Sequence, residues 1–186
     1  MRCALLLTLY VICNTLEAAT PSGRSSYTVE ILVFRNLSGA REDYYVPSGG
    51  ATRAEEKNNS RGSQVAQFIR NVPKSQLKLN AVNEKLAISG AYRPLVHAGW
   101  TQTTSSWGSR SGLSLDTLGI RVPGLSGYVN LQRGTLLHLG LNLRYANPEG
   151  GAAQQINESR KIRFNEKNYF DHPAIGVIAI ITPGPK

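Results

Sequence analysis

Hydrophobic and polar residues alternate through two neighbouring stretches of the chain, and this period of two predicts β-strands. The stretches are residues 125–132 and 135–145, and Arg133 and Gly134 join them. Leucines and other apolar residues fall on one face of both stretches, whereas polar residues fall on the other. The pattern predicts a β-hairpin with one face in the core and one polar face.

Four more stretches are predicted to be strands, from a run of β-branched and aromatic residues or from apolar residues that share one face. One of them contains Pro94, which has no backbone N–H to donate, and we expect a sheet edge or a bulge there. The last stretch is almost wholly apolar. The four predicted strands are residues 27–34, 91–100, 154–164 and 175–181.

One stretch has the spacing of a helix. Leu79, Val82 and Leu86 recur at i, i+3 and i+7, Pro73 precedes them, and Gly90 follows. This spacing and these ends predict an amphipathic helix over residues 74–89. Strands with one main helix and no regular βαβ alternation predict an α+β fold, with a mainly antiparallel sheet that the helix covers on one face.

Two segments show no sustained period. Residues 36–62 are mostly Gly, Ser, Asn, Glu and Arg, and we expect a long mobile loop there. Residues 101–117 are rich in Thr, Gln, Ser and Gly and are predicted to be a flexible loop.

The N-terminus has the pattern of a secretory signal peptide. Arg2 precedes an apolar run over residues 3–13, and a polar stretch then ends in Ala18 and Ala19. We expect cleavage of residues 1–19 and a single mature domain over residues 20–186. The apolar run is shorter than the roughly 20 residues that span a bilayer, and we expect no transmembrane segment in the mature chain.

Composition and charge narrow the function further. The chain has 186 residues, with 21 Lys and Arg against 12 Asp and Glu, and its formal net charge is +9. This charge favours polyanionic or acidic surroundings. Export and the lack of a recognition motif argue against a nucleic-acid partner. Both cysteines lie in the predicted signal peptide, so no thiol chemistry is expected in the mature chain.

The sequence favours a binding protein over an enzyme. No serine lies in a Gly-x-Ser-x-Gly motif, and no pair of carboxylates stands out for glycosidic cleavage. We therefore predict no catalytic residues and no cofactor. The alternative is a metallohydrolase in which His97, His138 and His172 converge, but their wide spacing does not favour a metal site.

Two groups of residues have the chemistry of a ligand site. Tyr128, His138 and Arg144 fall on the polar face of the predicted hairpin, together with amide side chains, and this face suits a saccharide or a peptide. Arg160 and Arg163 carry planar guanidinium groups that suit carboxylates. The alternative is that Arg160 pairs internally with Glu158 or Asp171 and that Arg163 is only solvated. Trp100, at the end of an apolar strand face, is predicted to be a core residue.

The order of these elements resembles the CsiV family of peptidoglycan-binding proteins. The resemblance is carried by residues 27–36, 92–102, 137–139, 160–163 and 169–177. It implies a non-catalytic periplasmic protein that binds peptidoglycan and supports cell-wall synthesis and cell shape, together with wall-synthesis proteins. The alternative is an interaction protein that regulates a peptidoglycan synthase without binding the wall.

The resemblance also adds residues to the candidate site. Tyr169, Asp171 and His172 match the family by position, whereas Asn168 stands where a histidine is expected. The predicted ligand-binding residues are Arg160, Arg163, Tyr169, Asp171, His172, Tyr128, His138 and Arg144.

Overall fold

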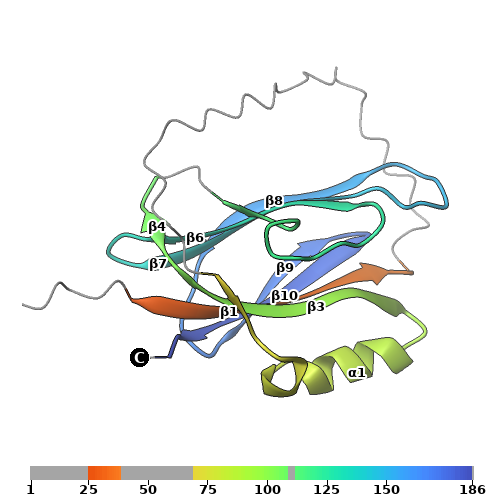
Figure 1. Cartoon of the computed structure of the whole chain (residues 1–186). Helices are drawn as coiled ribbons and strands as arrows, with labels where there is room; N and C mark the ends of the chain where they lie inside the picture. Colours follow the sequence, from red (N-terminus) through yellow and green to blue (C-terminus); the bar gives the residue numbers. More distant parts are fainter. Residues whose placement is uncertain (1–24, 39–68, 109–111, 186) are drawn as a thin grey trace, which may run out of the picture.

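A computed structural model describes residues 25–38, 69–108 and 112–185, which form two β-sheets and a short helix, α1 (Asn80–Ile88) (Figure 1). The helix-side sheet has the strand order β2-β3-β1-β10-β9, and the hairpin sheet has the order β4-β6-β7-β8, with β5 paired to β6. The helix-side strands are β1 (Ser26–Asn36), β2 (Arg70–Asn71), β3 (Tyr92–Thr103), β9 (Lys167–His172) and β10 (Ile175–Pro183). The hairpin-sheet strands are β4 (Ser105–Ser106), β5 (Leu113–Ser114), β6 (Leu125–Arg133), β7 (Leu137–Tyr145) and β8 (Gln154–Lys161).

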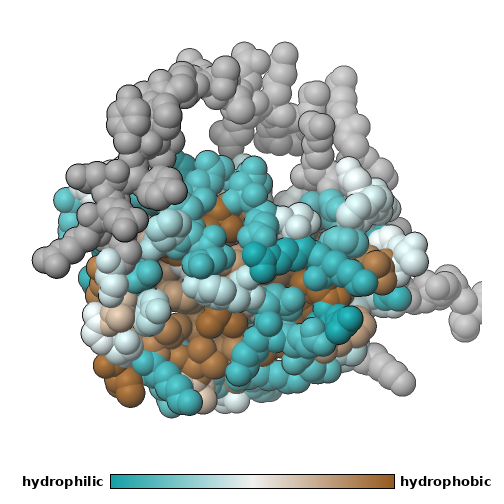
Figure 2. Space-filling model, turned by 180° about the vertical axis from the view of Figure 1, so that it is seen from behind, coloured by the Kyte–Doolittle hydropathy of each residue, from teal (hydrophilic) through white to brown (hydrophobic). Residues whose placement is uncertain are grey.

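The two sheets pack through their apolar faces, and these faces form one continuous core. Val29 and Ile31 of β1 belong to the same buried cluster as Leu139 and Leu141 of β7. Trp100 is also buried in this cluster, which confirms its predicted place in the core. Seen from behind, hydrophilic residues predominate over the upper part of the molecule, at the level of the hairpin sheet (Figure 2).

The α+β fold, the mainly antiparallel pairing and the main strands are confirmed, and the short β4 pairs with β6 in parallel. The predicted hairpin is β6 and β7, which pair from Leu125 with Tyr145 to Arg133 with Leu137. The bulge expected near Pro94 is also present, because the β1–β3 register shifts between Val33 and Phe34. The sequence did not predict that the hairpin would form a second sheet with β8 instead of joining the sheet of β1.

Two other expectations were wrong. Residues 101–117 are not one flexible loop, because Thr101–Thr103 end β3, and β4 and β5 pair with β6. Pairing with a neighbouring strand satisfies the hydrogen-bonding groups of the backbone, so a segment with the composition of a loop can still form a strand. The predicted strand over residues 154–164 ends earlier, at Lys161, and a separate strand, β9, follows. Most of the predicted loop over residues 36–62 and the whole predicted signal peptide lie outside the described residues.

The helix covers one face of the helix-side sheet as predicted, but it is shorter than predicted. Leu79, Leu32 and Ile180 form a second buried cluster, against which Val82 and Leu86 of α1 pack. Residues 74–79 do not continue the helix: a 3-10 turn, η2 (Lys74–Gln76), is followed by Leu77 in an extended conformation, with ψ of 137°.

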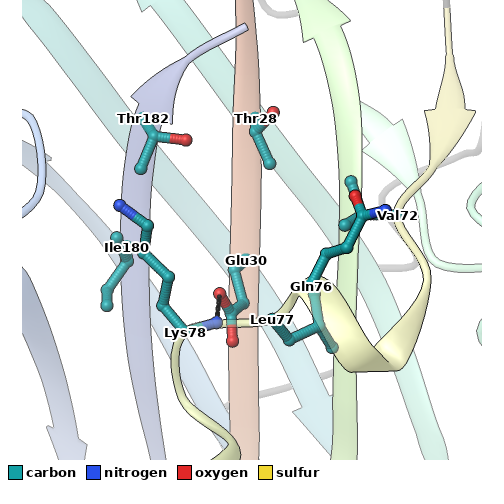
Figure 3. A pocket seen from close by; sticks show the side chains of 8 residues that line it. All are labelled: Thr28, Glu30, Val72, Gln76, Leu77, Lys78, Ile180 and Thr182. Carbon is teal, nitrogen blue, oxygen red and sulfur yellow. Dashed lines mark hydrogen bonds between the residues drawn. The ribbon is translucent and has the colours of Figure 1, made fainter.

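A buried carboxylate on β1 accounts for this interruption. Glu30 Oε2 accepts the backbone N–H of Lys78 at 2.8 Å, and Glu30 Oε1 accepts that of Leu79 at 2.7 Å (Figure 3). His97 Nε2 on the neighbouring strand β3 lies 2.8 Å from Glu30 Oε1. The two N–H groups therefore serve the carboxylate instead of an unbroken helix, and the negative charge lies at the N-terminus of α1, where the helix dipole favours it.

The small cavity beside Glu30 has a volume of about 30 Å³. Thr28, Thr182 and the side chains of Gln76 and Lys78 surround it (Figure 3). A cavity of this size has room for about one water molecule. It is therefore part of the helix attachment and not a ligand site.

We expect Glu30→Gln to lower the free energy of unfolding by about 2–4 kcal/mol, because a buried acceptor of three polar groups loses its charge and one acceptor oxygen. The matched control is Glu166→Gln, whose exposed carboxylate lies 3.7 Å from Arg163 and for which we expect a change below about 0.5 kcal/mol. Urea unfolding of the purified proteins measures both values. Similar losses for the two variants would contradict the role of Glu30.

Candidate functional site

The outward side of the hairpin sheet, here called the hairpin face, is the polar surface that the sequence predicted. The apolar inward residues of β6, β7 and β8, such as Val129, Leu141 and Ile156, are buried in the core, so the alternate residues point outward. Cross-strand pairing aligns the outward residues in rows, and in one row Tyr128 lies opposite Asn142, which lies opposite Asn157. The hairpin face comprises Ser126, Tyr128, Asn130, Gln132, His138, Gly140, Asn142, Arg144, Gln155, Asn157, Ser159 and Lys161.

A hollow of about 220 Å³ lies in the middle of this face. Gly140 lies at its centre, between Asn130 on one side and Ser159 on the other. Because Gly140 has no side chain, the surrounding polar groups border a depression instead of a filled surface. The hollow is lined by Gly112, Tyr128, Asn130, Gly140, Leu141, Asn142, Asn157, Glu158 and Ser159.

Polar groups around the hollow are held in place by neighbouring contacts. Ser105 Oγ on β4 donates to Asn130 Oδ1 at 3.2 Å, and Gln155 Nε2 donates to Asn142 Oδ1 at 3.3 Å. These contacts restrain the two amide side chains before a ligand arrives, which lowers the entropic cost of binding. Tyr128 remains 46% exposed and offers its ring to a ligand.

A second aromatic group lies at one end of the hairpin face. The indole of Trp107, which is 60% exposed, lies 4.3 Å from the imidazole of His138 between ring centroids. His138 itself lies in the outward row of Gln132 and Lys161. Trp107 comes from the segment that was predicted to be a flexible loop, so the sequence did not place it beside His138.

Arg160 lies on the opposite, inward side of β8 and joins the two sheets. Its Nε donates to the Glu158 carboxylate, and its Nη1 donates to the backbone carbonyl of Tyr169 at 2.7 Å. Its guanidinium also lies 5.1 Å from the ring centroid of Phe170 on β9. The internal pairing with Glu158 that the sequence left open is therefore present.

Tyr169 and Asp171 lie together on the outward side of the helix-side sheet, away from the hairpin face. The Tyr169 hydroxyl donates to Asp171 Oδ1 at 2.9 Å. The Tyr169 ring stacks on Phe34, with centroids 6.2 Å apart, and Phe34 meets Tyr92 edge to face. A Cβ atom at Gly176 would lie 2.5 Å from Phe34, so the glycine makes room for this aromatic group.

The pKa of Tyr169 is raised from 10.0 to about 12. Loss of water around the half-buried phenol is the main cause, and the hydrogen bond to the negative Asp171 carboxylate adds to it. Tyr169 is therefore a neutral hydrogen-bond donor under ordinary conditions.

Two predicted site residues lie next to turns. Arg163 follows β8, and its Nη1 lies 3.7 Å from Glu166 Oε1. His172 ends β9, and its Nδ1 lies 3.4 Å from the backbone N–H of Ala174. The structure thus brings Tyr128, His138 and Arg144 together on one face and places the other five predicted residues elsewhere.

The three histidines do not converge, which argues against the metallohydrolase alternative. His97 contacts Glu30 on the helix-side sheet, His138 contacts Trp107 on the hairpin face, and His172 is the last residue of β9. Within residues 25–38, 69–108 and 112–185, no three His, Cys, Asp or Glu side chains are grouped so that they could hold a metal ion.

Phenol, indole, amide and hydroxyl groups around a hollow in the hairpin face have the chemistry of a binding surface. A family model described as "Peptidoglycan-binding protein, CsiV" matches residues 3–184. The chain therefore belongs to the CsiV family, whose description names it as a family of binding proteins, and the predicted resemblance is confirmed. No curated protein and no solved structure gave a significant match to the chain. In the part of the chain that the structure describes, no helix is long and apolar enough to cross a membrane.

We expect Arg160→Ala to lower the free energy of unfolding by about 1–2 kcal/mol, because the variant loses a charged hydrogen bond between the sheets and a contact with Phe170. Arg163→Ala serves as the control, and its unfolding free energy should change by less than about 0.5 kcal/mol. Chemical denaturation measures the difference. If Arg163→Ala were as destabilising as Arg160→Ala, the structural role of Arg160 would be wrong.

Tyr169 should ionise later than an ordinary tyrosine, near pH 12. The folded state favours the neutral phenol, so its contribution to stability is complete below the unfolded pKa of 10.0 and is lost as the pH rises from 10.0 to about 12. The difference in tyrosinate absorbance between the wild type and Tyr169→Phe measures this midpoint. Asp171→Asn should lower the midpoint, and an unchanged midpoint would exclude the hydrogen bond as a cause.

Proposed function

We propose that this protein binds peptidoglycan through the hairpin face and does so without catalysing a reaction. Membership of a family described as peptidoglycan-binding supports the ligand. The exposed Tyr128 beside a hollow lined with amide and hydroxyl groups supports the hairpin face as the binding site. Aromatic rings stack on the apolar faces of sugars, while amides exchange hydrogen bonds with hydroxyl and acetamido groups.

The charges of the protein support the same ligand. Peptidoglycan stems carry carboxylates, and the chain has a formal net charge of +9. Long-range attraction of this kind concentrates a basic protein near an acidic polymer. Arg144 and Lys161 lie at opposite ends of the hairpin face, where they can meet these carboxylates.

The wider role is part of the same proposal. The N-terminal sequence supports export to the periplasm, where peptidoglycan lies, and a mature protein that begins after residue 19 as a single binding domain. There the protein supports cell-wall synthesis and cell shape. Arg163, Tyr169, Asp171 and His172 lie outside the hairpin face, so contacts through them would need a second surface on the wall polymer.

A second candidate function is recruitment of a wall-synthesis protein. Ile88 at the end of α1 is 86% exposed, and α1 covers the helix-side sheet, on the side away from the hairpin face. A partner bound there would leave the hairpin face open. Crosslinking from this position in cells would identify envelope proteins, and Ile88→Asp would abolish those crosslinks without changing sacculus binding.

We expect Tyr128→Ala to weaken retention on purified sacculi about fivefold, because loss of one ring contact removes about 1 kcal/mol. Tyr169→Ala is a matched control: its ring is 44% exposed, close to the 46% of Tyr128, but it lies on the other sheet. Co-sedimentation at increasing sacculus concentration gives the affinities. Weaker binding by Tyr169→Ala, with Tyr128→Ala unaffected, would move the site to the helix-side sheet.

A further inference from the structure

The hairpin face is uncharged in its middle and cationic at its ends. The two middle rows contain a phenol, three amides and a hydroxyl around Gly140. Arg144 lies in the row at one end, with Ser126 and Gln155, and Lys161 lies in the row at the other end. No Asp or Glu occupies an outward position of β6, β7 or β8, and the Glu158 carboxylate is paired with Arg160.

This distribution of charge favours one of the two parts of peptidoglycan, the glycan strand, over the other, the stem peptide. The carboxylates of a stem peptide would meet no cationic side chain among the residues that line the hollow, and its amine would meet only Glu158, whose carboxylate is already paired with Arg160. Both groups would lose solvation there. A sugar of the glycan strand carries hydroxyl and acetamido groups, which donate and accept hydrogen bonds as asparagine side chains do. We infer, on the basis of the proposed function, that the hollow binds an N-acetylated sugar of the glycan strand and not the stem peptide.

The size of the hollow agrees with one sugar ring. Its volume of about 220 Å³ is smaller than the roughly 300–1,000 Å³ of clefts that enclose drug-sized ligands. A whole disaccharide with its peptide does not fit. The ring in the hollow stacks against Tyr128 and reaches Asn142 and Asn157, and the neighbouring sugars continue over the surface outside.

The position of the second aromatic group, Trp107, indicates the direction in which a bound glycan strand lies on the hairpin face. Trp107 contacts His138, which lies in the row of Gln132, four residues along β6 from Tyr128. This separation is roughly 13 Å at the rise of a β-strand. A glycan strand that lies along β6 and β7 contacts the hollow and then the Trp107 indole, while its stem carboxylates extend outward near Lys161 and Arg144.

The test uses sacculi, glycan strands released from them by an amidase that removes the stems, and free stem peptides. Wild-type protein should be displaced from sacculi by the glycan strands and not by stem peptides at the same molar concentration. Gly140→Phe should reduce glycan-strand binding at least tenfold by filling the hollow. A Cβ atom there meets its nearest neighbours at 3.6 Å, an ordinary contact, so we expect the variant to fold.

Ile88→Phe is the matched control, because it places the same ring at a position that is 86% exposed on α1, on the side away from the hairpin face. Its binding should stay within about twofold of wild type, a difference of about 0.4 kcal/mol. Thermal unfolding of both variants shows whether they fold. An unfolded Gly140→Phe would be replaced by Asn157→Phe, which crowds the same hollow from β8.

The outcomes separate this inference from the proposed function. If wild-type protein binds sacculi but only stem peptides displace it, the glycan inference is overturned and peptidoglycan binding stands. If wild-type protein does not bind sacculi at all, the proposed function fails first. Trp107→Ala should weaken binding of long glycan strands more than binding of a single disaccharide, and an equal loss for both would remove Trp107 from the binding surface.

Discussion

The packing of two sheets through their apolar faces is the constraint on which the rest of the structure depends. Each sheet has one inward face, and burial of leucine, isoleucine and valine side chains there supplies most of the driving force for folding. Each sheet is then left with one outward face. The outward face of the helix-side sheet is covered in part by α1, whereas the hairpin face is open, and the candidate site lies on the open face.

The outward face of the helix-side sheet is largely occupied by its own chain. Glu30 fixes the start of α1, Leu32 and Ile180 receive the apolar side of the helix, and the ring of Phe34 covers Gly176 beside Tyr169. A buried carboxylate is costly unless it is paired and hydrogen-bonded, and two backbone N–H groups and His97 meet that need. The helix and its attachment cover much of this outward face, so the hairpin face is the broader polar surface.

The hairpin face combines restrained polar groups with an open centre. Asn130 and Asn142 are held by contacts from neighbouring strands, and Gly140 leaves the space between them unfilled. A site on paired strands keeps its groups at fixed spacings, unlike a site on loops. Arg160 contributes from the other side of β8, where it ties the hairpin sheet to β9 and so holds the edge of the candidate site in place.

The sequence by itself determined the α+β class, the polar side of the β6–β7 hairpin with Tyr128, His138 and Arg144, the core position of Trp100 and the family. The class, the polar side of the hairpin and the position of Trp100 follow from local periodicity and composition, which neighbouring residues carry. The family follows from the resemblance of several segments in their order along the chain. Only the tertiary structure decided that the hairpin forms its own sheet, that Trp107 meets His138, and that Arg160 and Tyr169 lie away from Tyr128. It also decided where α1 begins, because the carboxylate that interrupts the predicted helix lies 48 residues from Lys78. Contacts between residues so far apart in the sequence produce no hydrophobic periodicity that could predict them, because the local pattern around each residue is compatible with many different contacts.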